Sequence, residues 1–554
     1  MKAPTRASTP RPPSLLPSPN PTAITTPSDM QTLPPFLFFF FFFLLLLLSS
    51  FLCPSLSTHV SDDIEFWCSN TPHPEPCRYY LGRNPYLGAP KDKAQFYELS
   101  LRLALDLTLR AQSRLKRRGL ACRRSPEKTA WIDCWKLYAN TVFQLNRTLA
   151  PPPGAGCTAF DSQTWLSAAL TNIQTCPKGF RDTRASSELI GPVVRYNVSD
   201  LVSNCLAINR PAAADADRGR FSGWTTFGNR RLLQLSAAAD VVVAKDRSGN
   251  FRTIKEALDA ASMRMQGRRG SKFVIRIKAG VYNEYLQVVS SLSNLVMVGD
   301  GIGKTIITGS RSVANGYTTL SSATFSVFGD GFFASGITFR NTFGPGSQAV
   351  ALLSASDRSV FYRCSIEGYQ DTLFVYTQRQ FYRECDIYGT IDFIFGNAAA
   401  VLQRCNIYAR RPRHGESNVV TAQGRSDPNQ NTGIVIQSSN IKPAAELLPV
   451  RRTVRSYLGR PWMQYSRTLY LQNYIDGIID HAGWLPFRGS FALSTLYYAE
   501  FENTGPGARM SRRVKWPGYH VIRRSSIVRP FTVGRFIAGG SWIPSTGVPF
   551  NPSL

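Results

Sequence analysis

Apolar residues recur at helical spacing between residues 59 and 210. Two apolar stripes comprise Trp131, Trp135, Tyr138, Val142 and Leu145 in "WIDCWKLYANTVFQL", and Trp165, Leu166, Ala169, Leu170, Ile173 and Cys176 in "TWLSAALTNIQTC". We interpret both stripes as core, with Asp161 as the N-cap of the second helix. The segments Ala94–Leu115 and Glu188–Ala207 add two more long helices. The pattern predicts an antiparallel four-helix bundle.

The pattern changes to strands after residue 236. "KFVIRIKAGVYNEYLQV" alternates at a period of two, and short apolar segments with Gly and Asn turns continue to Leu554. Residues 211–236 are rich in Ala, Gly and Arg without periodicity, which is typical of a linker. The part from 237 to 554 is too long for a typical β-sandwich.

A repeat in this second part indicates how its strands are arranged. Cys364, Cys385 and Cys405 are 21 and then 20 residues apart, and Asp371 and Asp392 each follow a cysteine by seven residues. A period of this length made of short strands predicts a parallel β-helix with one coil per repeat. Stacked coils lie about 4.8 Å apart, so the cysteines form a column whose adjacent members could be bridged. The alternative is that these residues share a period by accident.

Two stacked carboxylates predict a site for acid–base or nucleophilic catalysis. At about 5 Å they cannot both ionise freely, so one becomes an acid and the other a base or nucleophile. Asp392 stands among apolar residues in "TIDFIFGN" and needs a cation, which Arg460 in "YLGRPW" could supply. The competing interpretation is that both aspartates cap turns.

The N-terminal residues and the composition bear on location. Residues 1–58 comprise a Pro-, Ser- and Thr-rich tail and the thirteen apolar residues Phe36–Leu48, which predict a signal peptide or a retained signal anchor. Eleven cysteines and the glycosylation sequons at Asn146 and Asn197 agree with passage through the secretory pathway. The net charge of +28 favours polyanionic partners. No CxxC pair and no GxSxG motif occurs, so neither a zinc site nor a serine esterase is expected.

Phrases throughout Ala237–Phe550 resemble the pectin methylesterases of plant cell walls. They are "SQAVAL", "GYQDTL", "RQFYREC", "DFIFGNAAAV", "LGRPW", "SRTLYLQ", "GPGA" and "TGVPF". The resemblance implies a right-handed parallel β-helix that hydrolyses the methyl esters of polygalacturonate and releases methanol, without cofactor or metal. Arg247 and Met463 depart from the usual Gly and Lys of that family, outside the expected catalytic set.

The resemblance also assigns roles to matching residues. Asp392 is similar to the family nucleophile, Asp371 to the acid and base, and Arg460 to the arginine that keeps the nucleophile ionised. Gln348 and Gln370 resemble the amides that stabilise the oxyanion. The expected substrate-binding residues are Thr319, Gln348, Phe395, Arg460 and Trp462. A disulfide between Cys385 and Cys405 is implied, with Cys364 free.

The helical part resembles the pectin methylesterase inhibitor domain that precedes many of these enzymes. "CSNTPHPEPC", "DCWKLY" and "WLSAALTNIQTC" carry the likeness, which implies the bridges Cys68–Cys77 and Cys134–Cys176. Precursors of the family are cut at a dibasic site such as "RRLL", here at Arg230 and Arg231. The helical domain is therefore expected to restrain the enzyme until a subtilisin-like protease cuts the linker. The alternative is a folding aid without inhibitory activity.

The sequence thus predicts a mainly β catalytic domain, residues 237–554, preceded by an all-α four-helix bundle, residues 59–210. We expect a secreted cell-wall pectinesterase that is a monomer, acts on methyl-esterified homogalacturonan and meets inhibitor proteins. No nucleic acid is expected, and a membrane only if the apolar run is retained. The alternatives are a glycoside hydrolase on the same β-helix, whose carboxylates would stand about 5–5.5 Å apart, and a non-enzymatic pectin-binding protein.

Overall fold

A computed structural model describes residues 62–82, 90–119, 122, 124–151, 157–210, 239–266 and 270–554. The chain divides into two units, residues 1–59 and 60–554, and the second unit contains all of these described residues. The apolar run Phe36–Leu48 and the pair Arg230–Arg231 lie outside the described residues. Within those ranges, no helix has the length and apolar character that crossing a bilayer requires.

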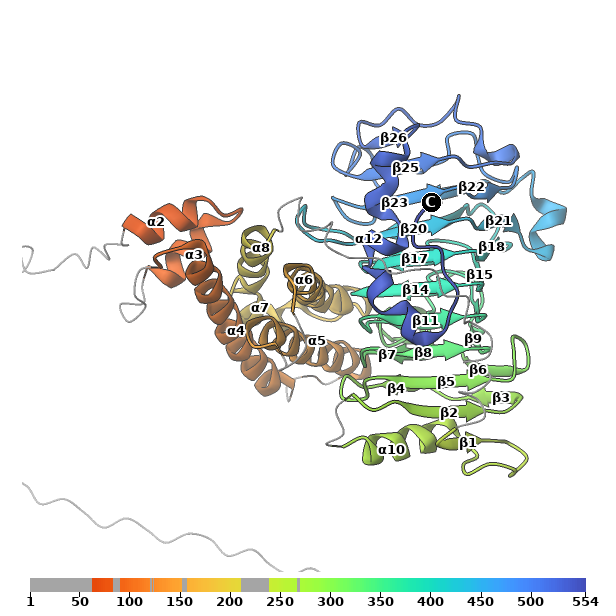
Figure 1. Ribbon diagram of the computed structural model, residues 1–554, viewed down its shortest axis with the longest axis horizontal. Helices are drawn as coiled ribbons and strands as arrows, with labels where there is room; N and C mark the ends of the chain where they lie inside the picture. Colours follow the sequence, from red (N-terminus) through yellow and green to blue (C-terminus); the bar gives the residue numbers. More distant parts are fainter. Residues whose placement is uncertain are drawn as a thin grey trace, which may run out of the picture. The chain divides into compact units, whose positions relative to one another are not determined.

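Residues 62–208 form the predicted all-α domain. Its α-helices are α2 Asp62–Ser69, α3 Pro74–Leu81, α4 Lys93–Arg118, α5 Ser125–Leu149, α6 Ala159–Asp182, α7 Gly191–Val194 and α8 Val198–Ile208 (Figure 1). Helices α4, α5, α6 and α8 contact one another and bury an apolar core that includes Leu107, Leu145, Leu170 and Leu206. The predicted bridges Cys68–Cys77 and Cys134–Cys176 are both formed.

Three details of the helical prediction are wrong. The segment Glu188–Ala207 is not one helix: it contains a 3₁₀ turn Ser187–Leu189, then α7 and α8. Asn197 separates the last two with a φ of 50°, which a right-handed helix does not allow. Asp161 is not the N-cap of α6, because the Thr158 hydroxyl caps the helix and Asp161 completes a capping box from the third position. Trp135 is 37% exposed instead of buried in the core.

The second part is a parallel β-helix built from three sheets, here called A, B and C, with 11, 8 and 7 strands. Sheet A contains β1 Val241–Val243, β2 Phe273–Ile277, β5 Leu295–Gly299, β8 Phe333–Ser335, β11 Ser359–Tyr362, β14 Arg379–Arg383, β17 Ala399–Gln403, β20 Gly433–Gln437, β23 Arg467–Leu471, β25 Tyr497–Phe501 and β26 Tyr519–Val521. Sheet B contains β3 Gly280–Asn283, β6 Thr305–Gly309, β9 Thr338–Asn341, β12 Ser365–Glu367, β15 Asp386–Gly389, β18 Asn406–Ala409, β21 Asn440–Pro443 and β24 Tyr474–Ile475. Sheet C contains β4 Leu286–Val288, β7 Phe325–Val327, β10 Leu352–Ser354, β13 Leu373–Val375, β16 Ile394–Gly396, β19 Asn418–Gln423 and β22 Ser456–Gly459.

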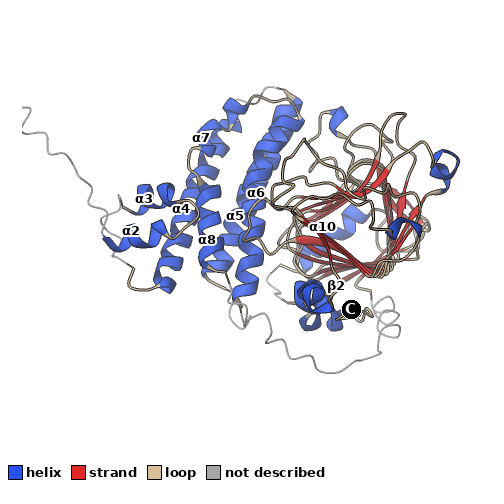
Figure 2. Ribbon diagram, turned by 90° about the horizontal axis from the view of Figure 1, so that it is seen from above, coloured by secondary structure: helices blue, strands red, loops and turns tan. Residues whose placement is uncertain are grey.

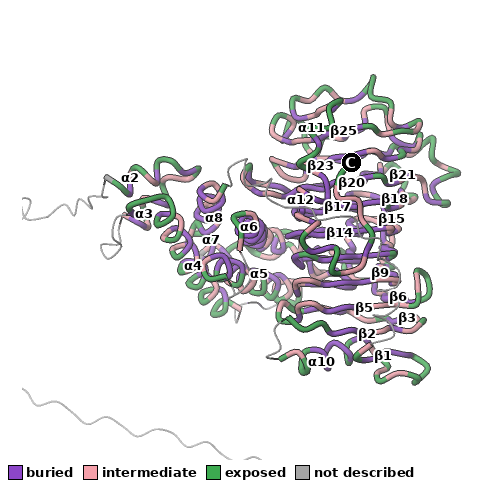
Figure 3. Tube along the Cα trace, in the orientation of Figure 1, coloured by how far each residue is buried: buried purple, intermediate pink, exposed green. Residues whose placement is uncertain are grey.

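Each full coil passes from sheet A to B to C, and seen from above the strands of successive coils superpose (Figure 2). The interior is filled by aliphatic and aromatic side chains, and buried residues follow the strands (Figure 3). Helix α10, Ile254–Arg264, packs Ile254, Ala257 and Leu258 into the same core beside β1. The short helices α11 Ser525–Val528 and α12 Val533–Phe536 pack against residues of sheet A such as Val401 and Leu469.

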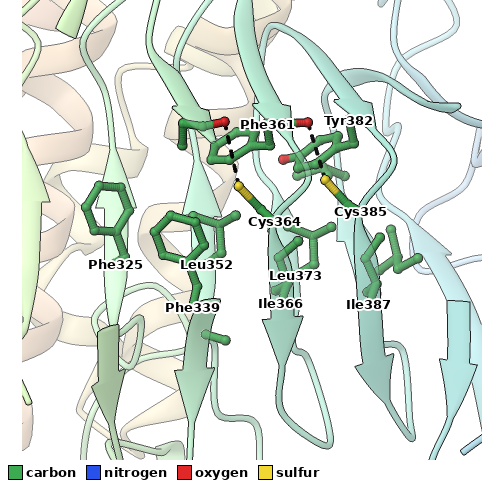
Figure 4. Close-up of a cluster of buried hydrophobic side chains, with 14 of the residues drawn as sticks. Phe325, Phe339, Leu352, Phe361, Cys364, Ile366, Leu373, Tyr382, Cys385 and Ile387 are labelled. Atoms are coloured by element: carbon green, nitrogen blue, oxygen red, sulfur yellow. Dashed lines mark hydrogen bonds between the residues drawn. The ribbon is translucent and has the colours of Figure 1, made fainter. Parts of the chain in front are cut away.

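The predicted cysteine column is present. Ser365, Asp386 and Asn406 are in register, so the cysteines before them stack on consecutive coils. The Cys385–Cys405 bridge predicted from the family resemblance is wrong for this structure, because Cys364, Cys385 and Cys405 are all free thiols. The Cys364 thiol donates to the Ala334 carbonyl and the Cys385 thiol to the Phe361 carbonyl, at 3.6 and 3.3 Å (Figure 4). Each thiol thus points toward the backbone of the preceding coil inside the core.

Candidate active site

The turns from sheet B to sheet C, here called the B-to-C turns, bring the predicted carboxylates together. Asp371 lies between β12 and β13, and Asp392 lies between β15 and β16. Each stands two residues before a member of the aligned pair Leu373 and Ile394, so the two aspartates occupy the same position on consecutive coils. Their φ angles are 60° and 52°, a left-handed conformation that is uncommon for residues other than glycine. The turns from sheet A to sheet B have the same conformation at Arg363, Glu384 and Arg404, so it is a recurrent feature of turns in this β-helix.

Arg460 binds Asp392 through a two-pronged fork. Its Nε and Nη2 donate to Oδ1 and Oδ2 of Asp392 at 2.8 and 2.7 Å. The Arg460 backbone N–H donates to the Thr421 carbonyl, and its guanidinium lies 4.8 Å from the centre of the Phe487 ring. Arg460 is therefore the cation that was predicted to accompany Asp392. It binds both carboxylate oxygens, a geometry that is stronger and more specific than a single hydrogen bond.

The electrostatics distinguish the two carboxylates. Burial, followed by the charge of Asp392, raises the pKa of Asp371 well above its ordinary value. Burial also raises the pKa of Asp392, but the hydrogen bonds and charge of Arg460 oppose that rise. The upward shift of the pKa is therefore larger for Asp371, and the Arg460 guanidinium favours the charged form of Asp392. This is the division between acid and nucleophile that a carboxylate pair needs.

Gln348 and Gln370 stand beside the pair with uncommitted amides. The Ala349 N–H donates to the Gln370 carbonyl at 3.2 Å, so the two B-to-C turns are joined. In the ranges that the structure describes, neither side-chain amide forms a hydrogen bond with another protein group. Arg410 secures the Gln370 turn by donating to the Gly368 carbonyl and the Tyr369 hydroxyl. Both amides remain available as donors to a developing oxyanion.

Aromatic rings line the same face of sheet C. Phe395 is 3% exposed and stacks on Phe374 with ring centres 4.2 Å apart. The Trp462 ring lies edge-on to Phe395 at 5.9 Å. Gly424 leaves room for this indole, because a Cβ there would stand 2.7 Å from a Trp462 ring atom. Trp462 and Phe395 thus form one platform with Phe374, which was not predicted as part of it. Phe374 precedes Phe395 by one coil period and is in register with it, so the repeat could have predicted its place in the platform.

Residues of the helical domain occupy this face. Asp182 of α6 accepts hydrogen bonds from the Thr319 N–H and hydroxyl at 3.0 and 2.8 Å. Lys178 donates to the Thr319 hydroxyl at 3.1 Å and places its Nζ 5.6 Å from the centre of the Trp462 ring. The cavity left between Lys178, Asp182, Thr319 and Phe374 measures about 10 Å³, which is about the space of one water molecule. Thr319 and Trp462, which the family resemblance predicts to bind substrate, are therefore in contact with the helical domain.

Two buried arginines reinforce the same contact. Arg147 of α5 pairs with Asp330 at 2.6 Å and donates to Gln378, both on the β-helix. Arg379 of the β-helix binds Asp161 of α6 at 2.7 Å and Asp357 at 2.6 Å. A buried charge that loses its partner destabilises the protein. These pairs therefore favour the one arrangement of the two domains in which each arginine meets its carboxylate. The sequence predicted no role for Lys178, Asp182, Arg147 or Arg379. Their partners across the domain contact are distant in the sequence, so no local pattern distinguishes them from other charged residues.

Among the described residues, no group of three or more His, Cys, Asp and Glu side chains is arranged to hold a metal ion. The sequon residues Asn146 and Asn197 are both exposed, so an attached glycan would reach solvent.

A stacked carboxylate pair with an arginine fork and free amides, on the outside of a parallel β-helix, is the arrangement expected of a hydrolase that uses carboxyl groups for catalysis. The family model Pectinesterase matches residues 240–540, and the model Plant invertase/pectin methylesterase inhibitor matches residues 62–208. The chain belongs to the pectinesterase family and carries an inhibitor-like domain before the enzyme domain. The predictions of family, fold class and enzyme class are confirmed.

Similar proteins cover nearly the whole chain. Pectinesterase 2 of Citrus sinensis is 53% identical over 495 residues, which are 89% of this chain and 95% of the relative. Probable pectinesterase/pectinesterase inhibitor 17 of Arabidopsis thaliana is 52% identical over 504 residues, or 90% and 96% of the two chains. The solved structure of pectin methylesterase from carrot is 53% identical with a TM-score of 0.56, and the match covers 57% of this chain and 98% of that one.

Proposed function

We propose that this pectinesterase hydrolyses the methyl esters of cell-wall homogalacturonan through an aspartyl intermediate. Asp392, ionised by Arg460, attacks the ester carbonyl carbon, and Gln348 and Gln370 donate to the oxyanion that forms. Asp371 gives its proton to the departing methoxide, which leaves as methanol. Asp371 then takes a proton from water, the hydroxide attacks the acyl group, and Asp392 is released with a free galacturonate carboxylate.

The observation that carries this proposal is the fork from Arg460 to Asp392, beside Asp371 at the same position of the preceding coil. Burial and the charge of Asp392 raise the pKa of Asp371 well above its ordinary value, which suits one charged and one neutral carboxyl group. The test is methanol release from esterified pectin by residues 237–554, compared with viscosity loss. Methanol without rapid loss of viscosity supports the esterase. Viscosity loss without methanol would instead indicate a glycoside hydrolase.

The helical domain, in this proposal, restrains the enzyme. The contacts of Lys178 and Asp182 with Thr319 support this role, because they take up the donors and the ring that a sugar would meet. A domain that only assists folding would not need to cover Thr319 and Trp462. Cleavage after Arg230 and Arg231 in the linker 211–236 by a subtilisin-like protease is the proposed release step. Methanol release by the uncut chain at the rate of the cut enzyme would contradict the restraint.

We further propose that the protein is secreted to the cell wall, with residues 1–58 as tail and signal segment, 59–210 as inhibitor-like domain and 237–554 as enzyme. Asn146 and Asn197 carry glycans. Treatment of the secreted protein with a glycosidase, followed by mass measurement of the peptides that contain each sequon, tests the last point.

A further inference from the structure

A second concave site lies on the β-helix away from the carboxylate pair. It has a volume of about 610 Å³ and its lining includes Tyr285, Ser310, Arg311, Tyr317 and Thr342. Arg311 belongs to the B-to-C turn between β6 and β7, the type of turn that carries Gln348, Asp371 and Asp392 on later coils. Two coils separate this turn from that of Asp371, so the sites are about 10 Å apart along the coil axis. A chain that runs along the B-to-C turns would reach both.

Arg311 is an uncommitted cation with aromatic support. Its guanidinium carbon lies over the Tyr285 ring at 3.7 Å and over the Tyr317 ring at 4.7 Å from the centres. Across the described residues, its N–H groups have no hydrogen-bond acceptor and no carboxylate partner. Neighbouring arginines near the same edge differ, since Arg340 pairs with Glu367 and Arg410 pairs with Glu446. The two rings support the guanidinium through cation–π contacts and leave its N–H donors free.

The site is held in place by the backbone around it. The buried Asn341 side chain donates to the Arg311 carbonyl at 2.9 Å, and the Ser310 N–H donates to the Tyr285 hydroxyl at 2.9 Å. The Val313 N–H donates to the Gln348 carbonyl at 3.0 Å, which joins this turn directly to the turn of the active site. The Arg311 position is therefore fixed relative to the turn that carries Gln348.

We propose that Arg311, with Tyr285 and Tyr317, binds the free carboxylate of a galacturonate residue in pectin. This inference rests on the proposed function and extends it to the choice of substrate region. A planar guanidinium recognises a carboxylate through two parallel hydrogen bonds, and a methyl ester offers no negative charge for that contact. The Ser310 hydroxyl lines the same site as a partner for a sugar, and the Thr342 hydroxyl, which donates to the Gly309 carbonyl at 3.0 Å, can still accept a hydrogen bond. The site favours pectin that has already lost methyl groups, and it positions the next ester near Asp392.

The Arg311 site stays open while the helical domain covers Thr319. Every residue that lines it belongs to the β-helix. The helical domain reaches two neighbours of the lining: a Cβ at Gly316 would stand 3.4 Å from a Pro126 side-chain atom, and the Thr318 hydroxyl donates to Asp133. The uncut chain can therefore bind unesterified pectin through this site before its catalytic groups are exposed, and the inference can be tested on the full chain.

The test is calorimetric binding of a short unesterified oligogalacturonate to the full chain and to two variants. Arg311→Gln should weaken binding about tenfold, the usual loss for a charge-assisted contact at a partly exposed site. Lys304→Gln is the matched control, because Lys304 is exposed in the turn between β5 and β6 and its loss changes the net charge equally. It should bind like the parent. The fully methyl-esterified oligomer should bind the parent as weakly as Arg311→Gln binds the unesterified one.

Equal binding by Arg311→Gln and the parent would overturn the inference, as would equal losses in the two variants or equal binding of the two oligomers. Circular dichroism establishes that the variants are folded, and Arg311→Lys, which keeps the charge but lacks the fork, should lie between. Methanol release is measured separately on the cut enzyme. A chain without esterase activity would refute the proposed function while the binding comparison still decides on Arg311.

Discussion

Asp371 and Asp392 occupy one turn position on two consecutive coils, and only Asp392 has an arginine fork. The charge of Asp392 is one cause of the raised pKa of Asp371, after burial. The stacking of the coils therefore places a charged carboxylate beside Asp371 and helps to raise its pKa. The backbone places both carboxylates at equivalent turn positions. They differ in their side-chain contacts, because Arg460 binds Asp392.

Replacing Arg460 with lysine tests the fork. An ammonium group supplies a point charge and cannot hold both oxygens of Asp392 in one plane, so Arg460→Lys should lower the methanol release rate about 10- to 100-fold. Arg363→Lys is the control, since Arg363 forms an ion pair with Glu384 at 3.0 Å that is largely exposed. The control should change neither rate nor folding. An Arg460→Lys enzyme as fast as its parent would show that the fork is not needed.

The contact between Asp182 and Thr319 predicts a variant of the uncut chain with increased activity. Asp182→Ala removes the acceptor of two hydrogen bonds and the ion-pair partner of Lys178 at 3.1 Å, which weakens the cover over Thr319. Methanol release by the uncut chain should rise about tenfold or more. Glu188→Ala, an exposed carboxylate of the same domain, should leave the low rate unchanged. An unchanged rate in Asp182→Ala would exclude this contact as a restraint.

The domain contact should weaken as pH rises. The Thr318 hydroxyl donates to Asp133, which is buried at the contact, and burial raises the pKa of Asp133 to about 6. The packed domains therefore hold a proton that a solvated aspartate, with a pKa of about 3.9, releases earlier. Between about pH 4 and pH 6 the separated state binds fewer protons, so packing loses stability across that window and stays weaker above it. Lys136 and Asp182 are the other charged groups that act on Asp133.

Gel filtration after linker cleavage checks this pH dependence. The two domains should elute together at about pH 4 and separate more readily at about pH 7. Asp133→Asn should reduce the difference between these conditions, because it removes one of the protons that are linked to packing. Tighter association at the higher pH would contradict the assignment.

Peptide mapping without reductant should find Cys68–Cys77 and Cys134–Cys176 bridged and Cys385 and Cys405 unbridged, as in the structure. Alkylation after unfolding should label Cys364, Cys385 and Cys405 together. A Cys385–Cys405 peptide would restore the prediction made from the family resemblance. A Cys364–Cys385 peptide would be equally compatible with the column, because adjacent coils bring both pairs close.

The repeat of about 20 residues was sufficient to predict the coil, the cysteine column and the alignment of Asp371 with Asp392. These features follow from local spacing, because equal steps along a β-helix return to the same face. Helical spacing likewise predicted α4, α5 and α6. The break at Asn197 was missed because apolar periodicity continues across it, while a single positive φ ends the helix.

The sequence could not identify the residues that cover the active site. Lys178 and Asp182 form an i, i+4 pair on α6, and such pairs are usual on exposed helix faces. Their contact with Thr319, 137 residues from Asp182, depends on the packing of two domains. The same holds for Arg311, whose support by Tyr285 and Tyr317 depends on the path of two turns. Spacing along one element carries no information about such contacts.

The most direct test of the central claim is methanol release by Asp392→Asn in residues 237–554. The amide keeps the size of the side chain but cannot attack the ester as a carboxylate does, so methanol release should be abolished. Pectin binding should be nearly unchanged, because Trp462 and the basic surface remain. Asp371→Asn should fall by about 10²–10⁴-fold, the loss typical for a general acid and base. An Asp392→Asn enzyme that is folded by circular dichroism and releases methanol at close to the parent rate would contradict the aspartyl mechanism.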